Sequence, residues 1–249
     1  MKTKHHIDIN CDMGEGIGND ATIMPFISSA NIACGFHAGN GDSIRRTIDL
    51  ALQHNVHIGA HPSFRDKENF GRSEMQLPLD KIYAIVIEQL IKIDLIAKEK
   101  GTVLHHVKPH GALYNMASKN AKMACAIAQA VKDFNEDLIL YGLSGSYLIG
   151  EAKAIGLQTA SEVFADRTYQ DDGSLTPRSQ SNALIENEEQ MIEQVLQMVR
   201  EQTVTTVSGK TIPLIAETIC IHGDGKYAMQ FAKHLNQDLR NSKDLQKIK

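Results

Sequence analysis

Short apolar runs alternate with longer segments of helical periodicity from one end of the 249-residue chain to the other. A short apolar run bounded by turn residues is typical of a buried strand, whereas apolar residues at three- and four-residue steps indicate an amphipathic helix. The alternation therefore predicts repeated βα units, which form a parallel sheet. We expect strands at residues 6–11, 30–34, 56–60, 103–107, 138–141, 158–163 and 217–221.

Helical periodicity fills most of the chain between these runs. In one long segment, apolar residues recur from Ile82 to Ala97 and form a single stripe opposite a charged face. Residues 203–213 predict a short hairpin. With no linker or low-complexity tract, we expect one barrel domain over residues 1–249 whose tail, 241–249, frays. The expected helices are residues 42–54, 79–100, 112–134, 146–154, 187–201 and 226–241.

Composition excludes some classes of partner. The chain is 42% hydrophobic and 22% charged, which is ordinary for a globular protein, and its formal net charge of -4 offers no positive field for nucleic acid. No run approaches the ~20 apolar residues of a membrane span. Four cysteines without CxxC spacing favour a reduced protein. We therefore expect a cytoplasmic protein that binds neither nucleic acid nor membrane.

Titratable residues follow six of the seven expected strands. An open sheet usually places its ligand at one switch point, whereas a barrel collects side chains from nearly every strand end at a single rim. This distribution favours an irregular (β/α) barrel of about seven strands, with an active site at that rim. The residues are Asp12, His37, His61, Lys108, His110, Glu162, Asp166, Arg167, His222 and Asp224.

The charged candidates suggest acid–base and anion-binding roles. Either Asp12 or Glu162 could be a general base, because partial burial raises the pKa of a carboxyl group and lets it take a proton from water. Lys108 and Arg167 could hold a carboxylate or phosphate, the arginine through two hydrogen bonds at once.

The histidines leave more than one reading open. His37, His61, His110 and His222 could be acid–base groups, donors to an oxyanion, or metal ligands. Two imidazoles and a carboxylate would suffice for Zn²⁺, but the chain has no HExxH motif or other fixed ligand spacing. A divalent metal is therefore left undecided.

A glycine-rich stretch at residues 14–18 invites comparison with nucleotide-binding loops. Asn19 stands where the dinucleotide fingerprint needs glycine, and the Gly-Lys-Ser/Thr of the phosphate loop is absent. A tight turn or flexible active-site loop is the better interpretation, so these residues do not predict independent ATP binding.

Six stretches, in order and spread over almost the whole chain, together resemble the LamB/YcsF family. All the strand-end candidates lie within them, as does Asn10. The stretches are residues 8–15 (DINCDMGE), 29–39 (SANIACGFHAG), 59–63 (GAHPS), 107–115 (VKPHGALYN), 162–169 (EVFADRTY) and 221–224 (IHGD).

The resemblance implies a barrel similar to the glycoside hydrolase/deacetylase group and a defined activity. Members act with two partner subunits, B and C, to cleave the lactam of 5-oxo-L-proline to L-glutamate while ATP is hydrolysed; which subunit holds the ATP site is left open. We assign catalysis to Asp12, His37, His61, His110 and Glu162, and substrate binding to Asn10, Lys108, Asp166, Arg167, His222 and Asp224.

Two alternatives remain open. One is a stand-alone metal-dependent deacetylase or amidohydrolase, which would lose activity on chelation and regain it with Zn²⁺. The other is a non-catalytic subunit that binds the substrate for a partner. In that case, substitutions at the rim would change affinity and leave the chemical rate unchanged.

Overall fold

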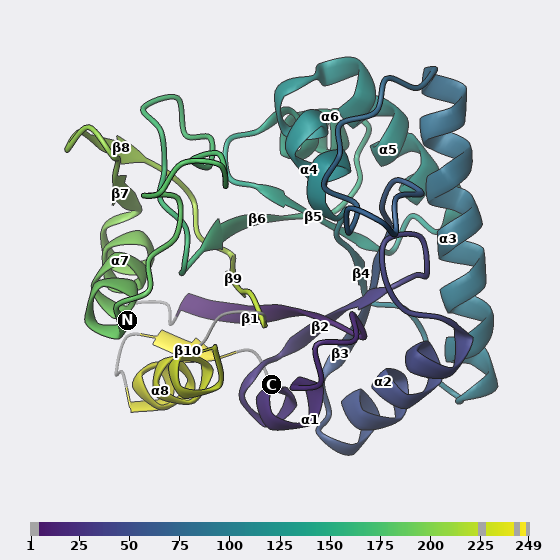
Figure 1. Cartoon of the computed structure of the whole chain (residues 1–249), viewed down its shortest axis with the longest axis horizontal. Helices are drawn as coiled ribbons and strands as arrows, with labels where there is room; N and C mark the ends of the chain where they lie inside the picture. The colour runs from purple at the N-terminus through teal and green to yellow at the C-terminus, as the bar shows by residue number, and fades with distance from the viewer. Residues whose placement is uncertain (1–4, 224–227, 242–244, 248–249) are drawn as a thin grey trace.

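Seven parallel strands close into a barrel within residues 5–223, 228–241 and 245–247, which the computed structural model describes (Figure 1). The last of these strands pairs with both the sixth and the first, so the seven strands form a closed ring. The predicted barrel of about seven strands is confirmed. Its strands are β1 His5–Met13, β2 Ser29–Ala33, β3 His57–His61, β4 His106–Val107, β5 Ile139–Leu143, β6 Thr159–Phe164 and β9 Thr218–Ile221.

Two strands differ in length from the prediction by more than one residue. β1 continues two residues past the expected end, because Asp12 and Met13 pair with Asn31 and Ile32 of β2. β4 contains only two residues, since the preceding Val103 is exposed to solvent and does not pair. Apolar character extended the prediction for β4, whereas hydrogen bonding with β3 and β5 sets its real length.

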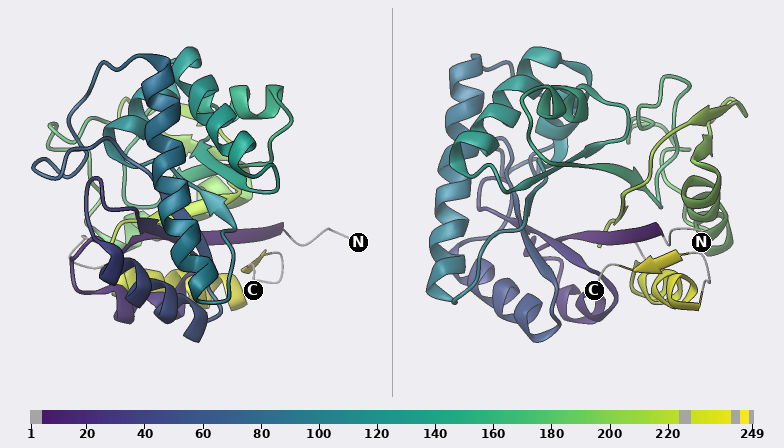
Figure 2. Two further views of the ribbon diagram at one scale, coloured as in Figure 1. Left: turned by 90° about the vertical axis from the view of Figure 1, so that its right-hand side faces the viewer. Right: turned by 180° about the vertical axis from the view of Figure 1, so that it is seen from behind.

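Helices cover the outside of the barrel. α3 runs along one side, packed between α2 and α5 (Figure 2, left), and buries the apolar stripe expected for it. α2 begins with a capping box in which the Asn40 side chain accepts a hydrogen bond from the Ser43 amide. The described helices are α1 Asp20–Ile23, the 3₁₀ turn η1 Met24–Phe26, α2 Gly41–Gln53, α3 Leu79–Glu99, α4 Gly111–Lys119, α5 Ala121–Phe134, α6 Tyr147–Ala154, α7 Glu188–Glu201 and α8 Ala228–Asn241.

The single helix predicted over residues 112–134 is wrong, because it is two helices. Asn120 has an extended backbone, with φ of -131° and ψ of 104°, which ends α4. Its side chain accepts a hydrogen bond from the Met123 amide at 3.2 Å and so caps α5. Asparagine is among the best N-capping residues, because its side-chain oxygen satisfies an amide that has no partner within the helix.

Two smaller pairings complete the fold. The hairpin predicted at residues 203–213 is present as β7 Thr203–Thr205 and β8 Thr211–Pro213, which pair antiparallel. In the tail expected to fray, β10 Leu245–Lys247 pairs in parallel with β1. None of the described helices combines the length and apolar character needed to cross a membrane.

The barrel interior is polar, and its polar side chains form the base of the site. Side chains alternate between the two faces of a strand. In β1, Ile7 and Ile9 join the apolar core that is shared with the helices, whereas Asp8, Asn10 and Asp12 make their hydrogen bonds across the interior. Polar groups removed from water destabilise a fold unless they are hydrogen-bonded, so these residues require partners from other strands.

Candidate active site

A buried lysine joins two carboxylates near the carboxyl ends of the strands. Lys108 Nζ lies 3.0 Å from Asp12 Oδ1, at the end of β1, and 2.8 Å from Glu162 Oε1 on β6. Burial alone would lower the pKa of Lys108, but the nearby negative charges outweigh it and hold that pKa well above its ordinary value. Burial would likewise raise the pKa of Asp12, yet nearby positive charge, including that of Lys108, holds it well below normal. Asp12 is thus an anion and a weak proton acceptor.

Two asparagine amides connect these carboxylates across the interior. Asn10 donates to Glu162 Oε1 at 2.9 Å, and Asn31 donates to Asn10 Oδ1 at 2.7 Å and to Asp12 Oδ1 at 2.8 Å. The other side of the Asn31 amide, its Oδ1, lies 2.7 Å from His106 Nε2. Because Asn31 already donates twice, that contact is a hydrogen bond from His106. The orientation of Asp12 is therefore linked to residues deep in the barrel.

Glu162 lies beneath the pocket rather than in it. Its Oε1 contacts Lys108 and Asn10, while its Oε2 accepts a hydrogen bond from the Tyr114 hydroxyl at 2.7 Å. The side chain is fully buried and does not line the cavity described below. With both oxygens engaged by donors, Glu162 fixes the position of Lys108.

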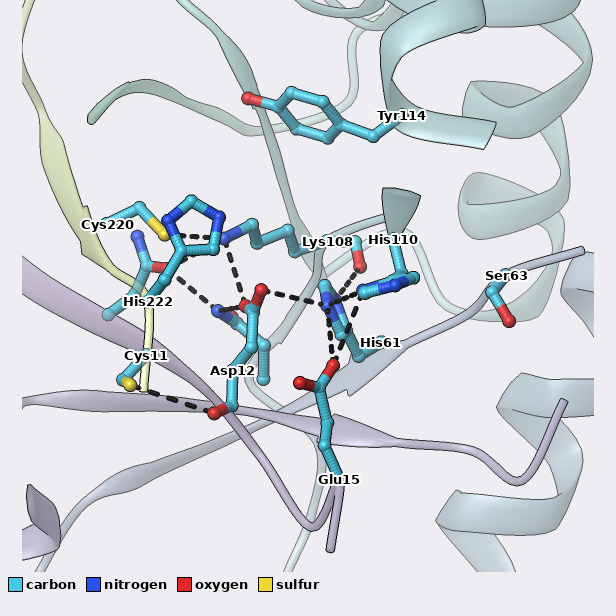
Figure 3. A network of polar contacts seen from close by, with 12 residues as sticks. Cys11, Asp12, Glu15, His61, Ser63, Lys108, His110, Tyr114, Cys220 and His222 are labelled. Carbon is cyan, nitrogen blue, oxygen red and sulfur yellow. Dashed lines mark hydrogen bonds and ion pairs between the residues drawn. The ribbon is translucent and has the colours of Figure 1, made fainter. Parts of the chain in front are cut away.

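Four more side chains gather beside Asp12. Gly14, with φ of 71°, turns the chain after β1 and places Glu15 toward residues from the next three strand ends. Its Oε1 lies 3.0 Å from His37 Nε2, 3.4 Å from His110 Nδ1 and 3.9 Å from His61 Nε2. The two nearest imidazole nitrogens, His110 Nδ1 and His61 Nε2, are 2.9 Å apart (Figure 3). We call these four residues the Glu15–histidine cluster.

Backbone carbonyls fix the protons on two of the rings. His61 Nδ1 lies 2.7 Å from the carbonyl oxygen of Lys108, and His110 Nε2 lies 2.9 Å from that of Phe70. A carbonyl oxygen only accepts, so each of these nitrogens carries a proton. In the neutral rings, the opposite nitrogens, which face Glu15, then carry lone pairs.

The third ring is held in the same way. Ser63 donates its hydroxyl proton to the Phe64 carbonyl, so its oxygen accepts from His37 Nδ1 at 2.9 Å. Burial lowers the pKa of His37 to about 3. The ring is therefore neutral near pH 7 and presents an Nε2 lone pair to the cluster.

A second group of potential ligands lies nearby but already holds a cation. Ligand atoms of Asp12, Cys220 and His222 are within 4.8 Å of one another. Lys108 Nζ lies among them, 3.1 Å from Cys220 Sγ and 3.0 Å from Asp12 Oδ1. The lysine ammonium thus supplies the positive charge that this group would otherwise attract.

A cavity of about 530 Å³ opens above Asp12 and the Glu15–histidine cluster. Its floor is anionic and rich in imidazole, and cations from the connecting loops and from the end of α4 lie in its wall. Tyr114 and Phe164 contribute apolar surface, so the cavity can enclose a small polar molecule. The cationic residues that line it are Arg72, Lys108, Lys119, Arg167 and Arg178.

The Arg167 guanidinium is held in place by neutral groups. It is buried, and it donates to the backbone carbonyls of Ala183 at 3.2 Å and Thr176 at 2.6 Å. Burial and the neighbouring charge of Arg178 lower its pKa to about 10, so it is still protonated near pH 7. A positioned guanidinium bonded to carbonyls keeps its charge for an anion.

Asp166 orients a histidine on the opposite side of the cavity. His222 Nδ1 lies 2.9 Å from both carboxylate oxygens of Asp166. Burial would raise the pKa of Asp166, but the charge of His222 and its hydrogen bond lower it. Asp224, also predicted to bind substrate, lies outside the described residues.

Sequence reasoning gave no role to Glu15, Asn31 and Tyr114, which the structure brings into the network. Glu15 could have been found, because it is a titratable residue in the loop after the first strand, like the residues that were chosen. Asn31 lies inside a strand, and Tyr114 lies on a helix whose register had to be known. No local pattern singles out either of them.

The LamB/YcsF family profile matches residues 7–248. A protein from Oceanobacillus iheyensis, named as the A subunit of 5-oxoprolinase, is 50% identical over 243 residues, covering 96% of this chain and 95% of that protein. The crystal structure of a lactam utilization protein from Thermus thermophilus is 38% identical, with a TM-score of 0.88, covering 97% of this chain and 99% of that one.

A more distant neighbour shares the fold alone. A family 4 carbohydrate esterase from Streptomyces lividans, solved with acetate, is 11% identical with a TM-score of 0.52, covering 99% of this chain and 93% of that one. The predicted likeness to deacetylase barrels is thus confirmed. Together with the match across residues 7–248, these similarities show that the chain belongs to the LamB/YcsF family.

Proposed function

We propose that this chain is the A subunit of a 5-oxoprolinase and that its barrel opens the lactam ring of 5-oxo-L-proline to give L-glutamate. The observation that carries the proposal is one cavity with a cationic wall and an anionic, imidazole-rich floor. The substrate has two functional groups, a carboxylate and a cyclic amide. The cationic wall can bind the carboxylate, and the acid–base groups of the floor can act on the cyclic amide. Relatives that match over most of their length carry this name.

Arg167 binds the substrate carboxylate in this proposal. Its guanidinium plane is fixed by two carbonyls, and its remaining N–H groups are available to a carboxylate in a two-pronged contact. Such a contact orients the lactam as well as binding it. The lactam carbonyl would then lie toward the floor of the cavity.

Hydrolysis of the amide requires a base for water and an acid for the leaving nitrogen. We assign the base to Asp12, whose Oδ2 lies 3.3 Å from His61 Nε2 and faces the Glu15–histidine cluster. The pair of His222 and Asp166 returns a proton to the amine as the C–N bond breaks, in the manner of a carboxylate-oriented histidine. Lys108 holds Asp12 in place and compensates its charge.

Coupling to ATP is assigned to the partner subunits, B and C. A five-membered lactam is an unactivated amide, which gives a chemical reason for coupling its opening to ATP hydrolysis. The chain carries neither nucleotide-binding motif sought in its sequence, so we place the ATP site on a partner and the complex in the cytoplasm, where ATP is supplied.

The test is glutamate release from 5-oxo-L-proline and ATP. Three mixtures are compared: this chain alone, the B and C subunits without it, and all three together. We expect activity only in the complete mixture, and an Asp12→Asn chain should lower it by ~10²–10⁴-fold. Glutamate formed by B and C without this chain would refute the proposal.

The fold shared with a carbohydrate esterase gives a reason to test a second activity. A deacetylase or amidohydrolase acting alone would release acetate from acetylated sugars or peptides without ATP. The same preparation of this chain, assayed for acetate, decides between the two functions.

A further inference from the structure

We infer that Glu15, His37, His61 and His110 bind one divalent transition-metal ion, of the class to which Zn²⁺ belongs. The four residues come from the ends of four neighbouring strands, β1 to β4. Their ligand atoms all lie within 4.8 Å of one another. Separate segments of chain therefore bring three imidazole nitrogens and one carboxylate oxygen to a single point.

The outer hydrogen bonds of the cluster fix the rings as ligands. Each histidine gives its proton to an acceptor on the side away from Glu15: the carbonyl of Lys108, the carbonyl of Phe70, or the Ser63 hydroxyl. Histidines that bind metal are oriented in this way, with the second nitrogen bonded to a carbonyl, carboxylate or other acceptor. All three lone pairs consequently face inward.

Such a cluster is unfavourable without a cation. His110 Nδ1 and His61 Nε2 lie 2.9 Å apart, and in the neutral rings neither has a proton to share. The rings of His37 and His110 are stacked with centroids 3.8 Å apart, so charging both by protonation would place two cations face to face. One metal ion satisfies all four donors at once.

The donor set indicates the class of metal. Three imidazoles and one carboxylate suit zinc and its transition-metal neighbours, whereas Mg²⁺ and Ca²⁺ take oxygen ligands. The stoichiometry is one, because Lys108 Nζ already lies within the second group of Asp12, Cys220 and His222.

The ion would complete the proposed chemistry, and this part of the inference rests on the proposed function. A water bound to such an ion is more acidic than free water and gives up its proton more readily. Zinc lowers the pKa of a bound water to about 7. Asp12 Oδ2 lies beside the cluster, where it can reach such a water.

Metal binding is tested without substrate or partners. The full chain, carrying no polyhistidine tag, is treated with chelator, dialysed and titrated with Zn²⁺ by calorimetry, and its metal content is measured by mass spectrometry. Cobalt substitution adds a visible spectrum that reports four- or five-coordinate nitrogen and oxygen ligation. We expect one equivalent of Zn²⁺.

Matched variants locate the ion. His37→Ala should lower affinity at least tenfold, and Ser63→Ala, which removes the acceptor of His37 Nδ1, should lower it by ~10–100-fold. His54→Ala, at an exposed position at the end of α2, is the control and should retain one equivalent. Glu15→Gln is nearly isosteric and should fold normally, so a loss of affinity in this variant is not explained by misfolding. Circular dichroism checks the fold of each variant.

The outcomes separate this inference from the proposed function. No Zn²⁺ bound by the folded wild-type chain, or equal binding by wild type, His37→Ala and Glu15→Gln, would overturn the metal site even if the complex opens the lactam. One equivalent bound at these residues would support the site even if no glutamate is formed.

Discussion

The imidazole of His106 occupies the space that a side chain at position 59 would need. A Cβ built on Gly59 would lie 2.1 Å from His106 Nε2, the atom that donates to Asn31. Asn31 in turn donates to Asp12. The missing side chain on β3 thus allows a histidine on β4 to orient the proposed base on β1.

Substituting Gly59 by alanine should displace the His106 ring. We expect Gly59→Ala to lower the free energy of unfolding by ~1–3 kcal/mol, as overpacking of a core does, and to reduce glutamate formation. Urea unfolding measures the first effect and the complex assay the second. Gly150→Ala is the matched control, because a Cβ there meets nothing within 4 Å and α6 favours alanine over glycine. Equal stability of the two variants would contradict the packing argument.

Replacing Lys108 by methionine should be strongly destabilising. It would leave Asp12 and Glu162 buried without their shared cation, and breaking a buried ion pair on one side typically costs about 3–5 kcal/mol. Urea unfolding tests this. Adding Glu162→Gln to Lys108→Met should recover part of the loss, since one uncompensated charge is removed. A double variant less stable than Lys108→Met would show that the charges are not the cause.

Substitutions of Asp12 and Tyr114 should distinguish a catalytic residue from one that supports the site. Asp12→Asn retains the shape of the side chain but removes the base, so we expect kcat to fall by ~10²–10⁴-fold with little change in fold. Tyr114→Phe loses one hydrogen bond to Glu162 beneath the cavity, which should lower stability by about 1 kcal/mol and change kcat less than tenfold. The kinetics of the complete complex decide, and a larger fall in kcat for Tyr114→Phe would reverse the two assignments.

Arg167 should govern recognition of the carboxylate. Against 5-oxo-L-proline, Arg167→Met should raise KM more than it lowers kcat, because binding is lost in both ground and transition states. With 2-pyrrolidinone, which is the same lactam without a carboxylate, wild type and variant should perform alike. Arg200→Met, at an exposed position in the last turn of α7, is the control. A wild-type enzyme with no preference between the two lactams would refute the role.

The barrel could be predicted from sequence because its strands are apolar on the side that meets the helices and its titratable residues follow strand ends. The break at Asn120 could not, since apolar periodicity continues across it and only the backbone turn reveals two helices. Most of the predicted site residues do meet around one cavity. Their roles depend on partners that lie far away in the sequence. The position of Glu162 in the sequence suggests a general base, but Tyr114, Asn10 and Lys108 occupy its two oxygens.

The polar interior of the barrel bears on how the protein folds and on how it loses activity. Asn10, Asn31, Glu162 and Thr218 come from four different strands and Lys108 directly follows a fifth, and they satisfy one another's hydrogen bonds. No half of the barrel can close around them alone, because each half would leave buried polar groups without partners. We therefore expect assembly of the site and closure of the sheet to be a single cooperative event, so that inactivation and unfolding should share one transition.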